Sequence, residues 1–131
     1  MKFTIYQASR QGGRKNNQDR VAYSYSREAL LMVVADGMGG HMHGEIAAQI
    51  AVQTLTDQFQ KVAKQRLDDP MAFLADTTTR AHFAINDYAV EQDLLEIPHT
   101  TIVAAVVQDN TAYWAHVGDS RLYLIHHHPE G

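Results

Sequence analysis

The chain has 131 residues, of which 45% are hydrophobic and 20% charged, a composition typical of one globular domain that excludes an intrinsically disordered chain. The 11 basic and 15 acidic residues give a net charge of −4, so we expect neither a nucleic-acid partner nor an anionic membrane partner. The absence of cysteine excludes a disulfide framework, a thiolate nucleophile and a cysteine-ligated zinc site.

Targeting and membrane-spanning segments are not expected from this sequence. Residues 1–10 contain no apolar run of signal-peptide length. No stretch approaches the roughly 20 apolar residues that a membrane helix needs. We therefore expect a cytoplasmic protein.

The first third of the chain predicts three strands. Residues 3–9 and 21–26 alternate between apolar and polar side chains, and residues 29–35 form an apolar run that is typical of a buried strand. If the second and third strands pair antiparallel, Asp19 and Asp36 lie at the same end of the sheet. Two carboxylates meeting there are unfavourable unless a cation lies between them.

At Asp36 the sequence changes abruptly from an apolar run to a glycine-rich segment, DGMGGH. A carboxylate at the end of a buried strand would be held at the rim of the core. The glycines after it would let the backbone turn sharply and bring its carbonyl groups close to a ligand. This pattern indicates a site for a hard cation. The alternative is a hairpin turn, because Asp-Gly between apolar runs is a strong turn signal.

Two amphipathic helices follow. From residue 43 to residue 62 apolar residues recur at a spacing of three and four, and Glu45 in the first turn suits the helix dipole. Asp69 and Pro70 predict an N-cap and the first position of a second helix, whose apolar face runs from Leu74 to Tyr88.

Three further strands are predicted at residues 100–107, 111–117 and 121–126. The first is β-branched and almost wholly apolar, which is the pattern of a strand buried on both faces or inside a sandwich. Three strands, two helices and three strands in this order predict a layered α+β fold. We see one domain, residues 1–131, without repeats or linkers.

Three motifs occur in order along this chain: RKNNQD at residues 14–19, VADGMGGH at 34–41 followed by Gly44 and Glu45, and AHVGDSRLY at 115–123. The paired threonines at 100–101 are a weaker fourth. Together they resemble the PPM-type, or type 2C, metal-dependent serine/threonine protein phosphatases, and the DGMGGH form resembles the bacterial branch in particular.

The resemblance implies a four-layer α-β-β-α sandwich with antiparallel sheets and two divalent metals, Mn²⁺ or Mg²⁺, where the central sheets meet. Asp36 matches the carboxylate that bridges both metals, and Gly37 matches the residue whose backbone carbonyl is a ligand. Asp19 matches an acidic residue beside the metals. Asp119 matches a carboxylate linked with a third, weaker metal, although it could also be an ordinary turn residue.

The resemblance also implies a substrate site. Arg14 matches the arginine that holds the substrate phosphate, and a guanidinium offers paired donors for two phosphate oxygens; it could otherwise be a solvated loop residue. His41 is the second substrate-binding candidate. His41 and His43 could suggest a metal pair, but without a third ligand we expect a surface role for both.

The implied activity is hydrolysis of phosphoserine and phosphothreonine by a metal-activated water, with phosphorylated targets of serine/threonine kinases as partners. The resemblance covers only the N-terminal half of the family domain. No residue after Asp119 matches the later metal-ligating aspartates, so we expect an incomplete domain with an exposed strand edge and apolar surface. The chain could therefore be a phosphatase, an inactive fragment or a non-catalytic binding module.

Overall fold

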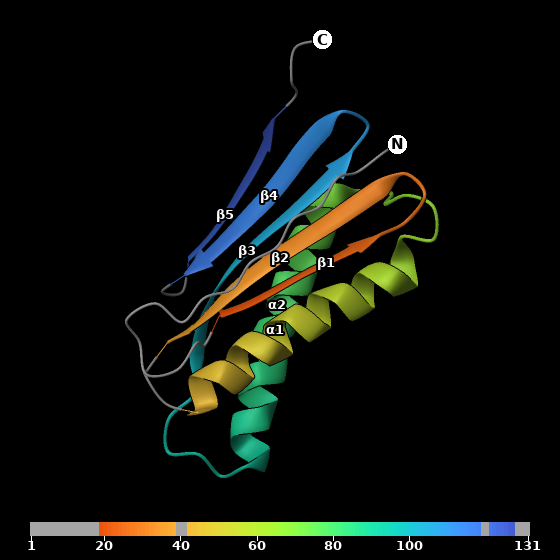
Figure 1. Ribbon diagram of the computed structural model, residues 1–131. Coiled ribbons are helices and arrows are strands. Elements are labelled where there is room, and N and C mark those ends of the chain that lie inside the picture. The colour runs from red at the N-terminus through yellow and green to blue at the C-terminus, as the bar shows by residue number, and fades with distance from the viewer. Residues whose placement is uncertain (1–18, 39–41, 119–120, 128–131) are drawn as a thin grey trace.

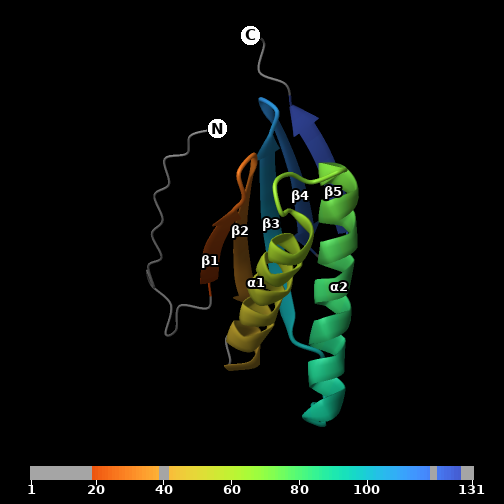
Figure 2. The ribbon, with the colours of Figure 1, turned by 90° about the vertical axis from the view of Figure 1, so that its right-hand side faces the viewer.

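The structure, a computed structural model, describes residues 19–38, 42–118 and 121–127. Within these ranges the chain forms one antiparallel sheet with the strand order β1-β2-β3-β4-β5, and two helices lie on one of its faces (Figures 1 and 2). The elements are β1 (Asp19–Tyr25), β2 (Ala29–Met38), α1 (Met42–Val62), α2 (Pro70–Glu91), β3 (His99–Gln108), β4 (Thr111–Gly118) and β5 (Arg121–His127). The α+β prediction is confirmed, whereas the strand predicted at residues 3–9 lies outside the described residues.

The core lies between the sheet and the helices. In β2 alternate residues Leu31, Val33 and Ala35 are buried under the helices, as the two-residue period of a strand requires. From α1, Phe59 packs edge-on against Phe73 of α2, with ring centroids 5.9 Å apart. The apolar face predicted for α2 is buried from Leu74 to Ile85, but Val62 at the end of α1 is exposed, contrary to its expected place on the buried face.

The opposite face of the sheet carries exposed apolar side chains. Met32, Val34 and Val103 are 38%, 44% and 44% exposed. Burial therefore alternates along β3. Of the two alternatives predicted for this strand, burial on both faces is not seen within the described residues, where both helices lie on the same side of the sheet, and a place inside a sandwich stays a prediction. The expectation of an exposed apolar surface is confirmed for this part of the chain.

Hydrogen bonds cap both ends of α2, from a side chain at the start and from the backbone at the end. The carboxylate of Asp69 accepts a hydrogen bond from the Ala72 amide at 3.0 Å, which confirms the predicted N-cap. At the other end Asp93 adopts a left-handed conformation with φ 53°. The Leu94 amide then donates to the Ala89 carbonyl at 3.0 Å, the bond that terminates many helices.

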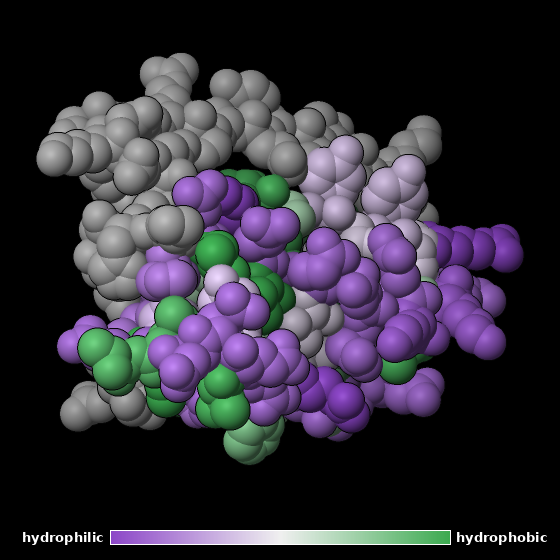
Figure 3. All heavy atoms as spheres, turned by 90° about the horizontal axis from the view of Figure 1, so that it is seen from below, coloured by the Kyte–Doolittle hydropathy of each residue, from purple (hydrophilic) through white to green (hydrophobic). Residues whose placement is uncertain are grey.

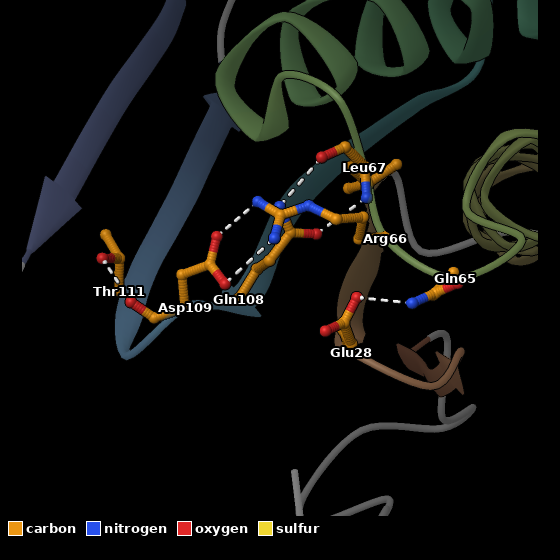
Figure 4. A network of polar contacts seen from close by, with 7 residues as sticks. All are labelled: Glu28, Gln65, Arg66, Leu67, Gln108, Asp109 and Thr111. Atoms are coloured by element: carbon orange, nitrogen blue, oxygen red, sulfur yellow. Dashed lines mark hydrogen bonds and ion pairs between the residues drawn. The ribbon is translucent and has the colours of Figure 1, made fainter.

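A polar network fastens the α1–α2 connection to the β3–β4 hairpin (Figure 4). The buried side-chain amide of Gln108 accepts a hydrogen bond from the Leu67 backbone amide at 2.7 Å and donates one to the Leu67 carbonyl at 2.9 Å.

An exposed ion pair and a tight turn complete the network. Arg66 forms an ion pair with Asp109, and this hydrogen-bonded carboxylate raises the pKa of Arg66. Asp109 and Asn110 have φ of 54° and 57°, the paired left-handed residues of a tight hairpin turn. The network lies at the end of the sheet away from Asp36.

None of the helices in the described ranges is long and apolar enough to cross a membrane.

Candidate functional site

The register of the sheet brings the motif residues of β1, β2 and β3 together at one end of the strands, called the sheet edge below. Asp19 pairs directly with Asp36, and Asp36 pairs on its other side with Thr101. The prediction that both aspartates lie at the same end of the sheet is confirmed. Asp36 follows the alternation of Met32 and Val34, so it lies on the sheet face opposite the helices.

The local backbone differs from the expectation at Asp36. β2 continues through Asp36 and Gly37 to Met38, and Gly37 pairs with Thr100. Asp36 is therefore within a paired strand rather than after its end, and the hairpin alternative is wrong. The pairing of β2 with strands on both sides keeps the backbone extended, where the glycine-rich sequence alone favours a turn.

Gly37 is required by close packing rather than by a turn. A Cβ atom built at Gly37 would lie 2.0 Å from the carbonyl oxygen and 2.4 Å from the carbonyl carbon of Gly44 in the first turn of α1. Only a residue without a side chain allows this approach. The contact fixes the start of α1 against the end of β2.

The hydroxyl of Thr100 ties β3 to the same place. It donates a hydrogen bond to the backbone carbonyl oxygen of Asp36 at 3.0 Å and lies 3.0 Å from the carbonyl oxygen of Thr101. A carboxylate, backbone carbonyl groups and a hydroxyl therefore lie together at this edge. These are the oxygen ligands that Mg²⁺ and Mn²⁺ prefer.

On the helix side an ion pair joins β1 to the start of α1. Arg20 pairs with Ala35 in the sheet register, and its guanidinium forms an ion pair with Glu45 in the first turn of α1. Glu45, expected to act through the helix dipole, thus also links α1 to β1. Sequence reasoning missed Arg20, because the only signal was its position next to Asp19.

β4 reaches the same edge of the sheet at Gly118. A Cβ atom built there would lie 3.6 Å from the methyl group of Thr101 and 3.7 Å from Nε2 of His116, both ordinary contact distances. The third motif thus approaches the paired threonines. Gly118, unlike Gly37, has room for a side chain.

Several predicted site residues lie outside the described residues: Arg14, His41 and Asp119. Asp19 is placed by its backbone register alone. Within the described ranges no group of three or more histidine, aspartate or glutamate side chains is close enough to hold a metal ion. The described part of the site is therefore a partial set of oxygen donors.

Comparisons with known proteins place the chain in a family. Residues 7–130 match the family described as Protein phosphatase 2C. The serine/threonine phosphatase stp of Listeria monocytogenes is 35% identical over 99 residues, which cover 75% of this chain and 39% of that protein. The chain spans about half the length, or less, of the curated relatives it matches.

Two solved structures share the fold. A bacterial serine phosphatase is 26% identical with a TM-score of 0.75, covering 90% of this chain and 52% of that one. The catalytic domain of the phosphatase PstP, in complex with two manganese ions, is 30% identical with a TM-score of 0.64, covering 86% of this chain and 49% of that one. From the family match over nearly its whole length, the chain belongs to the protein phosphatase 2C family.

Proposed function

We propose that this chain carries the N-terminal part of a metal-dependent protein serine/threonine phosphatase centre at the sheet edge around Asp36. The observation that carries the proposal is the direct pairing of Asp19 with Asp36 in a chain of the protein phosphatase 2C family. The register places two acidic positions of the family motifs directly opposite each other on neighbouring strands. Acidic residues brought together by the fold are a common way to hold a divalent cation.

The donor set fits Mn²⁺ or Mg²⁺. Asp36, Asp19 and the backbone carbonyl of Gly37 would hold two ions, and Asp119 would hold a weaker third. The bound metal would supply an activated water and neutralise charge on the phosphoryl group. The PstP neighbour, in complex with two manganese ions, supports this choice of metal. With so few carboxylates, this chain would bind the ions weakly and leave much of their coordination to water.

The substrate would be a phosphorylated protein, a target of serine/threonine kinases. The guanidinium of Arg14 would bind two oxygens of the phosphate and orient it toward the metals. His41 would contact the substrate beside it. A cytoplasmic location, without nucleic-acid or membrane partners, stays a prediction.

A non-catalytic binding module is the second candidate. It is favoured by the absence of a three-ligand cluster in the described part of the chain and by the exposed apolar sheet face. An exposed apolar face commonly marks a surface that another protein or protein segment covers. The two candidates differ in turnover, not in fold.

Hydrolysis of p-nitrophenyl phosphate by the 131-residue chain, with and without manganese, tests the proposal. We expect manganese-dependent turnover that is lost in Asp36→Asn. The matched control is Asp57→Asn on the exposed side of α1, where the carboxylate accepts a hydrogen bond from Gln53 at 2.8 Å; it should retain the parent rate. Arg14→Ala should raise KM more than it lowers kcat.

A chain that is folded, as shown by its circular dichroism, yet gives no turnover with manganese would contradict the enzymatic proposal and favour the binding module. Equal turnover in Asp36→Asn and the parent would show that Asp36 is not a metal ligand.

A further inference from the structure

Apolar side chains are exposed where α2 ends and the chain leads into β3. Val90 is 80% exposed, Leu95 is fully exposed at 104%, and Ile97 is 47% exposed. Figure 3 views the molecule from this end and shows apolar side chains (green) among hydrophilic ones (purple). Single exposed apolar residues are common, but three within one short segment form a candidate contact surface.

The segment is also acidic. Glu91, Asp93 and Glu96 are exposed, and none has an ion-pair partner among the described residues. The sequence contains no lysine or arginine between Ala81 and Ser120. We call the six residues the α2–β3 patch: Val90, Glu91, Asp93, Leu95, Glu96 and Ile97.

The backbone that carries the patch is held in place at its start. The amides of Asp93 and Leu94 donate to the carbonyl groups of Val90 at 3.1 Å and Ala89 at 3.0 Å. Leu95 therefore projects from a backbone already anchored to the helix end. A partner that binds here would order little of this segment, which lowers the entropic cost of association.

The end of the patch at Ile97 is close to the proposed site. Ile97 precedes Thr100 by three residues, so their Cα atoms are at most about 11 Å apart. The Thr100 hydroxyl donates to the Asp36 carbonyl at 3.0 Å. One extended peptide, rising about 3.3 Å per residue, could reach from Asp36 to Ile97 with three to five residues.

We infer that the α2–β3 patch binds the segment flanking the phosphorylated residue of a protein substrate, and that this segment carries basic and apolar side chains three to five residues from the phosphate. The inference rests on the proposed phosphatase function. The apolar residues would bury the apolar side chains of the partner, and the acidic rim would select lysine or arginine. An anionic membrane surface is disfavoured as the partner, since the same acids would repel it.

Two series of phosphoserine peptides test the inference, one with lysine and leucine three to five residues from the phosphoserine and one with glutamate and serine there. We expect the chain to hydrolyse the basic-apolar series with about tenfold higher kcat/KM, a difference that shrinks at high salt. Leu95→Ser and Glu96→Lys should each remove most of this preference. The matched controls, Val62→Ser and Asp57→Lys on α1, should retain it.

p-Nitrophenyl phosphate separates docking from chemistry, because it is too small to reach the patch. All four variants should hydrolyse it at the parent rate. Equal kcat/KM for both series, or a preference that Leu95→Ser and Glu96→Lys leave intact, would overturn the inference. So would equal losses on p-nitrophenyl phosphate and on the peptides, since the variants would then act on the centre itself.

If the parent does not hydrolyse p-nitrophenyl phosphate, the proposed function fails independently of the patch. Binding of the same peptides, measured by fluorescence anisotropy, then decides the inference. Binding of the basic-apolar series that Leu95→Ser weakens would support a docking surface. No binding, or equal binding by the Leu95→Ser variant, would overturn it.

Discussion

Substitution of Gly37 by alanine tests whether the contact between β2 and α1 organises the site. The added Cβ would lie 2.0 Å from the Gly44 carbonyl oxygen and must retreat by at least 1 Å to reach 3.0 Å, below which real Cβ contacts are essentially never found. The atoms in the way are backbone, so either the strand end or the first turn of α1 must move. Overpacking of this kind costs about 1–3 kcal/mol. For a chain of this size the melting temperature should fall by about 4–12 °C.

Gly118→Ala is the matched control, because its Cβ would meet nothing closer than 3.6 Å. Urea denaturation followed by circular dichroism should show lower unfolding free energy in Gly37→Ala and little change in Gly118→Ala. Calorimetric titration should show that Gly37→Ala also weakens manganese binding by about tenfold or more, since the Gly37 carbonyl moves with the strand. Equal stability and equal manganese affinity in the two variants would refute this reasoning.

Three further substitutions test the fold away from the site. Gln108→Met should lower the unfolding free energy by about 2–5 kcal/mol in urea denaturation, because two buried backbone groups of Leu67 lose their partners. A loss as small as that of an exposed-residue variant would show that the hydrogen bonds between Gln108 and Leu67 do not stabilise the fold. Asp69→Ala should cost about 1 kcal/mol by the same measurement, because the Ala72 amide loses its cap. Asp93→Gly should raise the melting temperature, with a gain of up to about 1 kcal/mol, because its φ of 53° suits glycine; a lower melting temperature would show that the Asp93 side chain stabilises the helix end.

Local patterns predicted the elements well. Three-and-four spacing placed both helices, and Asp69 before Pro70 marked the start of α2. The predicted meeting of Asp19 and Asp36 is confirmed by a direct pair. Each of these features depends on residues near in sequence or on one pairing of neighbouring strands, so a single sequence is enough to predict them.

Features that depend on distant contacts were harder to predict. Gln108 lies between the strands predicted at residues 100–107 and 111–117, and nothing in its neighbourhood in the sequence indicates that its buried side-chain amide bonds to Leu67, 41 residues away. Gly37 was expected to turn the chain, whereas its role is to admit Gly44. The apolar composition of β3 suggested burial on both faces, but composition does not reveal which layers cover a strand. The roles predicted for all six site residues stay predictions: Arg14, Asp19, Asp36, Gly37, His41 and Asp119.

A manganese titration followed by nuclear magnetic resonance would locate the metal in the folded chain. Paramagnetic Mn²⁺ should broaden the amide signals of Asp36, Gly37, Thr100 and Thr101 first. The signals of Asp109, about 26 Å away along β3, should stay sharp at the same concentration. Asp36→Asn should abolish the selective broadening. Broadening centred on exposed acids elsewhere, or unchanged in Asp36→Asn, would contradict a metal-dependent centre at this sheet edge.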